Sequence, residues 1–147
     1  MTPFDLRAEY LGPSEILKYF ILSFIEPPVT AGTPGPPETY RERRLDIFKK
    51  MVPYPEATYI WQAQGESMVG ARINPGDFMV VDSSVVPTQG RVVVATLNGG
   101  NTVKRLGLQG NRGCLLPENP VFEPIPIDED EGVKVLGVVT WVFHPVR

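Results

Sequence analysis

The chain has 147 residues, which suits one compact domain, since domains usually run to roughly 100 to 200 residues. Its 17 acidic and 14 basic residues give a formal net charge of -3, so a strongly basic surface that coats nucleic acid is excluded. One cysteine, Cys114, and one histidine, His144, exclude an intramolecular disulfide and a His/Cys zinc set. We expect a cytosolic globular protein without a metal or another cofactor.

An apolar segment occupies residues 14–25 near the start of the chain. Ser14 is a good helix N-cap and apolar residues follow it at mostly helical spacing, so the pattern predicts a short helix. Lys18 and Ser23 interrupt the apolar run, which is also shorter than the about 20 residues that a bilayer span needs. Acidic residues precede it, so the segment predicts neither a transmembrane helix nor a secretory signal.

The next two segments differ sharply in composition. Residues 27–37 contain five prolines and two glycines, which is typical of an extended, accessible linker. Residues 38–51 place apolar residues among charges and predict a second amphipathic helix that ends before Pro53. Its basic residues could contact DNA or an acidic partner, although a solvated helix face is the simpler interpretation. These residues are Arg41, Arg43, Arg44, Lys49 and Lys50.

From residue 58 onward the chain has short apolar or alternating runs separated by turn residues. Such runs predict strands at 58–64, 78–82, 91–97, 101–108, 114–117 and 133–144. Residues 98–100 (Asn-Gly-Gly) tolerate positive φ, so the strands on either side of them are predicted to form a hairpin. The fold class is therefore mainly β: a compact, mostly antiparallel β domain, preceded by a short helical and extended N-terminal arm.

Ser67 lies in the segment Gly65-Glu66-Ser67-Met68, which follows the first of these predicted strands. A serine at a sharp strand exit has free backbone N–H groups beside it, which suits a nucleophile, although a simple turn cap is the other interpretation. Because His144 lies beside Pro145 near the end of the chain, the base left for Ser67 is a lysine. Strand alternation places Lys104 on one face with Leu106, where burial would lower its pKa; a solvent-facing lysine is the alternative.

Six short motifs occur in order along this part of the chain: GESM (65–68), NPGD (74–77), VVDSS (80–84), TVKRL (102–106), LLPENP (115–120) and LGVVTWV (136–142). In combination they resemble the LexA and UmuD family of self-cleaving proteins, the S24 peptidases. The resemblance implies a LexA-type catalytic β domain with Ser67 as the nucleophile and Lys104, 37 residues later, as its base. It also implies that backbone N–H groups of Glu66 and Ser67 stabilise the oxyanion, and that NPGD is a structural turn.

Members of this family cleave themselves at an Ala-Gly or Cys-Gly bond ahead of the catalytic domain. Between residues 27 and 37 the bond of this type is Ala31-Gly32; the Gly35-Pro36 bond is also accessible but has no support from the family. Cleavage would remove an N-terminal arm, residues 1–31. It would leave residues 32–57 as a linker and short helix, and residues 58–147 as the peptidase-like domain.

The resemblance is closer to UmuD than to LexA, because only 31 residues precede the cleavage site, too few for a helix-turn-helix domain of roughly 60 residues. It implies a cytoplasmic homodimer that the RecA filament on single-stranded DNA stimulates. No direct sequence-specific DNA binding by the chain is expected. The trimmed form would serve a UmuC-like Y-family translesion polymerase in the SOS response, with no membrane association.

Two other classes of function stay open. The chain could be a LexA-type or phage-repressor-type regulator, or a non-enzymatic β-domain adaptor that cleavage switches. Cleavage should activate a polymerase subunit and inactivate a repressor, which distinguishes them.

Two further features have simple interpretations. Four successive acids at 128–131 cannot converge on one ion, so a solvated hairpin tip is predicted there instead of a metal site. Cys114 is predicted to be a small buried hydrophobic residue.

Overall fold

The computed structural model describes residues 21–26, 32, 41–127 and 132–146. The chain divides into two compact units, residues 1–53 and residues 54–147, and each is described by itself. Within the described residues, no helix combines the length and the apolar character that a membrane span requires.

The first unit contains a two-stranded antiparallel sheet. Strand β1 (Ile21–Glu26) pairs with β2 (Arg41–Asp46), and helix α2 (Ile47–Met51) follows β2 directly. The helix predicted over 14–25 is therefore wrong for residues 21–25, while residues 14–20 lie outside the described part. Of the second predicted helix, 38–51, residues 38–40 lie outside the described part, residues 41–46 form β2 and residues 47–51 form α2. Arg41, Arg43 and Arg44 therefore lie on a strand and not on a helix face.

The reason for this correction is pairing between distant segments. Six consecutive residue pairs join the two strands, from Ile21 with Asp46 to Glu26 with Arg41. Isoleucine and phenylalanine in β1 suit a strand as well as a helix, so the spacing of apolar residues could not decide between them. The backbone hydrogen bonds of the partner strand decide in favour of β structure.

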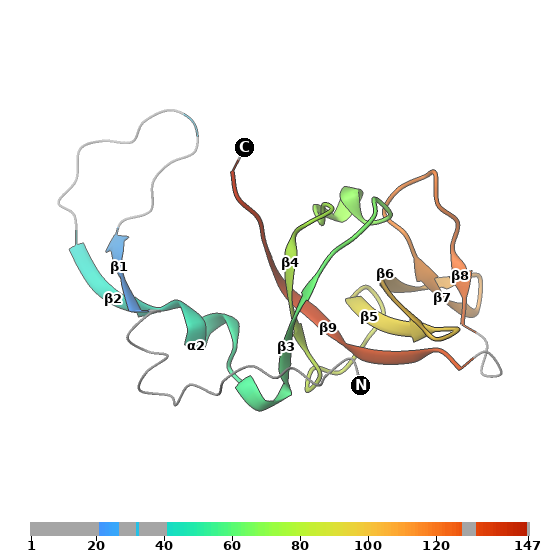
Figure 1. Cartoon of the computed structure of the whole chain (residues 1–147), viewed down its shortest axis with the longest axis horizontal. Helices are drawn as coiled ribbons and strands as arrows, with labels where there is room; N and C mark the ends of the chain where they lie inside the picture. Colours follow the sequence, from blue (N-terminus) through green and yellow to red (C-terminus); the bar gives the residue numbers. More distant parts are fainter. Residues whose placement is uncertain (1–20, 27–31, 33–40, 128–131, 147) are drawn as a thin grey trace. The chain divides into compact units, whose positions relative to one another are not determined.

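The second unit is built on one sheet of seven antiparallel strands, which Figure 1 follows from green β3 to red β9. The order across the sheet is β3-β4-β9-β5-β6-β7-β8. The strands are β3 (Thr58–Gln62), β4 (Phe78–Asp82), β5 (Val92–Leu97), β6 (Gly100–Gln109), β7 (Arg112–Leu116), β8 (Ile125–Pro126) and β9 (Lys134–Phe143). The mainly β, antiparallel fold predicted from the sequence is confirmed.

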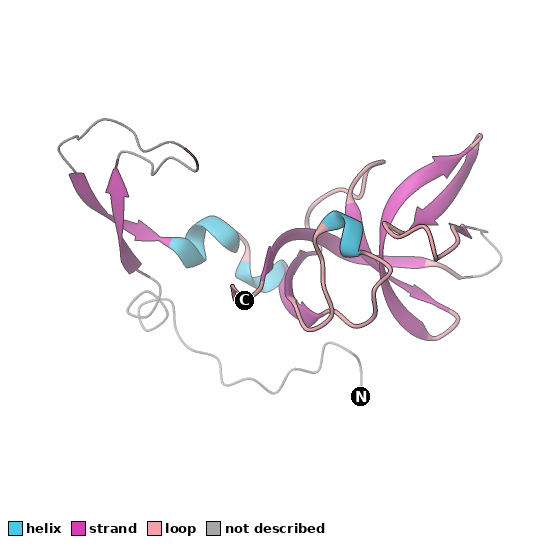
Figure 2. Cartoon of the chain, turned by 90° about the horizontal axis from the view of Figure 1, so that it is seen from above, coloured by secondary structure: helices cyan, strands magenta, loops and turns pink. Residues whose placement is uncertain are grey.

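Among the described residues of this unit, helical structure is limited to two single turns, η1 (Pro55–Ala57) before β3 and η2 (Val69–Ala71) after it. Figure 2 shows how short the helical segments are beside the strands. The predicted hairpin is confirmed: β5 and β6 pair antiparallel, and Asn98 and Gly99 between them have φ values of 50° and 80°. Two successive residues with positive φ give a turn whose twist matches that of the paired strands.

Strand β5 explains why the sheet has a core on both faces. Successive side chains of a strand point to opposite faces. Val94 belongs to one buried cluster, with Met68, Met79 and Val81, whereas Val93 belongs to another. The second cluster also contains Ala95, Leu115 and Val138. The continuous apolar run of β5 is thus explained by burial on both faces.

Candidate active site

A tight turn after β3 carries Ser67. Gly65 in this turn has a φ of 77°, a conformation that glycine adopts without strain. Met68, the residue after Ser67, is only 2% exposed and packs in the first buried cluster. Met68 anchors the turn in the core, which leaves the neighbouring Ser67 side chain at the pocket described below.

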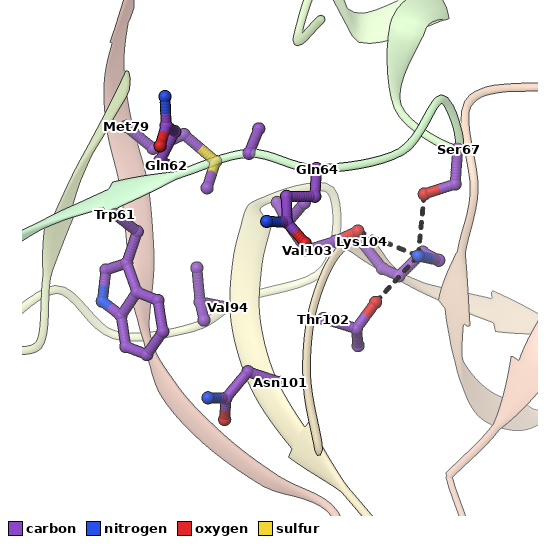
Figure 3. A pocket seen from close by; sticks show the side chains of 11 residues that line it. Trp61, Gln62, Gln64, Ser67, Met79, Val94, Asn101, Thr102, Val103 and Lys104 are labelled. Atoms are coloured by element: carbon purple, nitrogen blue, oxygen red, sulfur yellow. Dashed lines mark hydrogen bonds between the residues drawn. The ribbon is translucent and has the colours of Figure 1, made fainter. Parts of the chain in front are cut away.

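Strand β6 carries Lys104, whose side chain reaches Ser67. The Lys104 Nζ atom donates hydrogen bonds to Ser67 Oγ at 2.8 Å and to Thr102 Oγ1 at 2.8 Å. A third acceptor is the carbonyl oxygen of Val103, at 3.1 Å. Figure 3 shows Ser67 and Thr102 pointing toward the same lysine nitrogen from two different segments. The structure therefore brings together the two side chains that the sequence proposed as nucleophile and base.

Lys104 is in an unusual environment for a lysine. Only 8% of the residue is exposed, and its described hydrogen-bond acceptors are neutral oxygens. Burial disfavours the charged ammonium form, so desolvation lowers the pKa of Lys104 below its ordinary value of 10.5. A lysine with a lowered pKa is deprotonated more often near neutral pH, which is what a general base requires.

A pocket of about 250 Å³ opens beside the two side chains. Figure 3 shows Trp61 away from Ser67 and Lys104 across this pocket. Met79 and Val94 contribute apolar surface, while Gln62, Gln64 and Asn101 contribute amide groups. An extended peptide with one of its bonds at Ser67 could lay its neighbouring side chains against these apolar and amide groups of the pocket.

The backbone groups of Glu66 and Ser67 are the ones predicted to form the oxyanion hole. Among the described residues, the N–H groups of Glu66 and Ser67 donate no hydrogen bond, whereas the Ser67 carbonyl oxygen accepts one and the Glu66 carbonyl oxygen accepts two, one of them from the Val69 N–H at 3.3 Å. The Glu66 carbonyl accepts from Asn119 Nδ2 at 2.9 Å, and the Ser67 carbonyl accepts from the Glu118 N–H at 2.7 Å. Both N–H groups therefore have no competing acceptor in the described part of the chain.

The predicted cleavage site is placed only in part. Ala31 lies outside the described residues, and so do the residues on either side of the Ala31-Gly32 pair. Gly32 is exposed, and a Cβ atom added to it would meet nothing within 4 Å.

Other sequence predictions have mixed outcomes. Cys114 is fully buried, as predicted, and the NPGD motif forms a turn closed by a bond from the Asp77 N–H to the Asn74 carbonyl at 3.0 Å. The acidic residues 128–131 lie outside the described part. In the ranges that are described, no group of three or more His, Cys, Asp or Glu side chains could hold a metal ion.

No role for Glu118 and Asn119 was predicted from the sequence, although the LLPENP motif contains both. They lie in the loop after β7 and donate to the carbonyl groups of Ser67 and Glu66. These carbonyls belong to the turn 65–68, called the nucleophile turn below after the role predicted for Ser67. Their contacts join segments about fifty residues apart, so no local pattern could reveal them. The available signal was the placement of a Pro-Glu-Asn-Pro sequence directly after a buried strand.

The chain is similar to known proteins along most of its length. Residues 23–140 match the family described as Peptidase S24-like. The chain is 41% identical to protein MucA of Salmonella typhimurium over 121 residues, covering 80% of this chain and 82% of MucA. It is 40% identical to protein SamA of the same species, with coverages of 80% and 81%.

A further relative is the LexA repressor of Acidithiobacillus ferrooxidans. The identity is 41% over 119 residues, which is 79% of this chain but 58% of the repressor. The family match covers most of the chain, and the relatives named above share two fifths of their aligned residues with it. The chain therefore belongs to the S24 peptidase-like family and is a UmuD-like member of it.

Proposed function

We propose that this chain is a self-cleaving serine peptidase that cuts its own Ala31-Gly32 bond with a Ser67-Lys104 dyad. The observation that carries the proposal is the 2.8 Å hydrogen bond between Lys104 Nζ and Ser67 Oγ, made by a lysine that is 8% exposed. A surface lysine would be protonated and hydrated at neutral pH and could not accept the serine proton. The buried amine beside Ser67 can.

The reaction is an acyl transfer. The neutral Lys104 amine takes the proton from Ser67 Oγ as this oxygen attacks the Ala31 carbonyl carbon. The carbonyl oxygen becomes an oxyanion, which the N–H groups of Glu66 and Ser67 stabilise. The C–N bond to Gly32 then breaks, and the Gly32 nitrogen takes the proton from the Lys104 ammonium.

The second half of the reaction releases the acyl group. A water molecule gives a proton to Lys104 and attacks the Ala31-Ser67 ester, and Ser67 Oγ leaves with a proton returned by Lys104. The products are residues 1–31 and residues 32–147. One lysine thus serves as base and then as acid in each half, so no histidine is needed.

The biological setting is proposed from the family. The RecA filament on single-stranded DNA stimulates cleavage during the SOS response, and the trimmed homodimer acts as a subunit of a UmuC-like Y-family translesion polymerase. Similarity to MucA and SamA over about four fifths of each chain supports this setting. Similarity to a LexA repressor keeps a cleavable transcriptional regulator as the second candidate.

The test of the dyad is the intact mass of the purified chain before and after incubation at alkaline pH. We expect a fragment of residues 32–147 from the wild type and none from Ser67→Ala or Lys104→Ala. Ser84→Ala is the matched control, because the Ser84 hydroxyl bonds to Asp82 and lies outside the pocket lining. Cleavage that persists in Ser67→Ala would remove Ser67 from the mechanism.

The setting has its own test. Adding RecA, single-stranded DNA and ATP at neutral pH should speed the appearance of the same fragment. A trimmed chain that gains affinity for a Y-family polymerase supports the polymerase subunit. A full-length chain that represses transcription and loses this activity on cleavage supports the regulator instead.

A further inference from the structure

The loop between β7 and β8 holds the nucleophile turn through its backbone. The Glu118 N–H donates to the Ser67 carbonyl at 2.7 Å, and the Gly70 N–H donates to the Glu118 carbonyl at 2.8 Å. A Cβ atom at Gly70 would lie 2.5 Å from that carbonyl oxygen, so glycine is what permits this close approach. The two segments are thus joined on both sides of Glu118.

The Asn119 side chain makes the next contact in this loop. Its Nδ2 donates to the Glu66 carbonyl at 2.9 Å, and its Oδ1 accepts from the Val121 N–H at 3.1 Å. The Val121 bond can be accepted only by the amide oxygen, which fixes the amide nitrogen toward Glu66. Asn119 is therefore held in one orientation, with its donor on the peptide group that precedes Ser67.

Holding that carbonyl also fixes an N–H group. The peptide bond is planar and trans, so the carbonyl of Glu66 and the N–H of Ser67 point in opposite directions. A bond from Asn119 to the Glu66 carbonyl therefore directs the Ser67 N–H away from the loop. That N–H has no acceptor among the described residues, which is the state that an oxyanion donor needs.

An ion pair links the same loop to the strand of the lysine. Arg105 Nε donates to Glu118 Oε1, and Arg105 Nη1 donates to the Gly90 carbonyl at 2.7 Å. Arg105 follows Lys104 directly on β6. The loop is therefore tied to the nucleophile turn on one side and to the strand of the base on the other.

We propose that Asn119 is a positioning residue, which orients the Ser67 N–H for the oxyanion by holding the Glu66 carbonyl. This inference rests on the proposed self-cleavage and deepens it. Without the amide donor, the described bond left on the Glu66 carbonyl is the longer one from the Val69 N–H at 3.3 Å. The peptide group between Glu66 and Ser67 is then held less firmly, and its N–H no longer points steadily at the oxyanion. Asn119 is not among the described hydrogen-bond partners of Lys104, so its proposed role acts through the turn that carries Ser67.

The experiment measures the self-cleavage rate against pH for wild type, Asn119→Ala and Asn119→Asp. Alanine removes both contacts of the side chain, whereas aspartate keeps an acceptor for the Val121 N–H and supplies no donor. Loss of an oxyanion donor costs about 100-fold to 1000-fold in rate, so we expect about a tenfold to 100-fold lower plateau in both variants. In Asn119→Ala the pH midpoint should stay at the wild-type value, because Lys104 is untouched.

Asn111→Asp is the control, since Asn111 is exposed in the turn between β6 and β7. Thermal unfolding of each full-length variant accompanies the rates. Plateaus equal to wild type would overturn the inference, and so would rate losses in proportion to the unfolded fraction. If wild type yields no fragment, both the proposed function and the role of Asn119 are wrong. If wild type cleaves and Ser67→Ala does not, the proposed function stands, whatever the rates of the Asn119 variants.

Discussion

The protonation of one side chain should control the rate of self-cleavage. Lys104 can accept the Ser67 proton only as a neutral amine, and burial lowers the pKa of this amine below 10.5. The amine is therefore charged below its folded pKa and neutral above it. We predict that the cleavage rate rises with pH and reaches a plateau, with a midpoint below 10.5, measured as fragment formed per unit time at constant ionic strength.

The control for this profile is Lys134→Met, because Lys134 is exposed at the start of β9 and should leave both midpoint and plateau unchanged. Lys104→Met should give no cleavage at any pH. A wild-type rate that stays flat from neutral to alkaline pH would contradict a lysine base.

The same shift has a consequence for stability. The folded chain holds the Lys104 proton less tightly than the unfolded chain does, so the cost of burying the charged amine is present below the folded pKa. That cost is relieved as pH rises toward the unfolded pKa. We predict that, in a Ser67→Ala background that cannot cleave itself, the free energy of unfolding of the chain with Lys104 rises relative to that of the chain with Lys104→Met over this alkaline range, as measured by urea denaturation at several pH values.

Ser67 and Lys104 could be predicted from the sequence as a pair, but most of the residues that contact them could not. Ser67 and Lys104 stand in motifs with a family resemblance, and strand alternation placed Thr102 on the lysine's face, where it accepts a hydrogen bond from Nζ. The contact from Asn119 to Glu66 spans 53 residues and passes through a loop. Such a contact depends on the path of the folded chain, which residue spacing does not encode.

At the scale of elements, β9 joins the two parts of the sheet, because it lies between β4 and β5. It pairs with β4 along one part and with β5 along another, and its register shifts once against each. Gly137 lies in this strand opposite Val94. A Cβ atom there would come within 2.7 Å of Val81 Cγ1 and 3.2 Å of the Asp82 carbonyl oxygen.

We predict that Gly137→Ala lowers the free energy of unfolding by about 1 to 3 kcal/mol, because the added methyl group has no free space between β9 and β4. Urea denaturation of the full chain measures it. Gly113→Ala is the matched change on β7, where the nearest atom is 4.0 Å away, and it should alter stability by at most about 0.5 kcal/mol. Equal effects of the two substitutions would contradict this packing argument.

Elements were predictable where one pattern fitted only one structure. The runs in β4 and β5 are short, rich in valine and bounded by turn residues, so they suit strands and little else. In β1, the run ILSFIE fits either state, and the helix prediction there was wrong. Its partner β2 is so rich in charge, RERRLD, that no strand signal was visible before the pairing was known.

At the scale of the whole molecule, the chain divides after residue 53, and the candidate active site lies in the second unit. Both buried clusters lie entirely within residues 54–147. The same range contains Ser67 and Lys104, the pocket beside them and the loop that holds the nucleophile turn. Every described contact of the candidate site is therefore made within one unit.

We predict that residues 54–147, expressed alone, fold cooperatively and keep the hydrogen bond between Lys104 and Ser67. We expect cooperative folding because loss of the first unit removes no member of either buried cluster. A single sigmoidal transition on heating, monitored by circular dichroism, would show it. The fragment lacks residue 31, so it should be stable at alkaline pH, yet it should cut a peptide spanning residues 25–37, and its Ser67→Ala form should not. A fragment that melts without a transition, while the full chain melts with one, would mean that residues 1–53 complete the fold and that the peptidase unit begins earlier than residue 54.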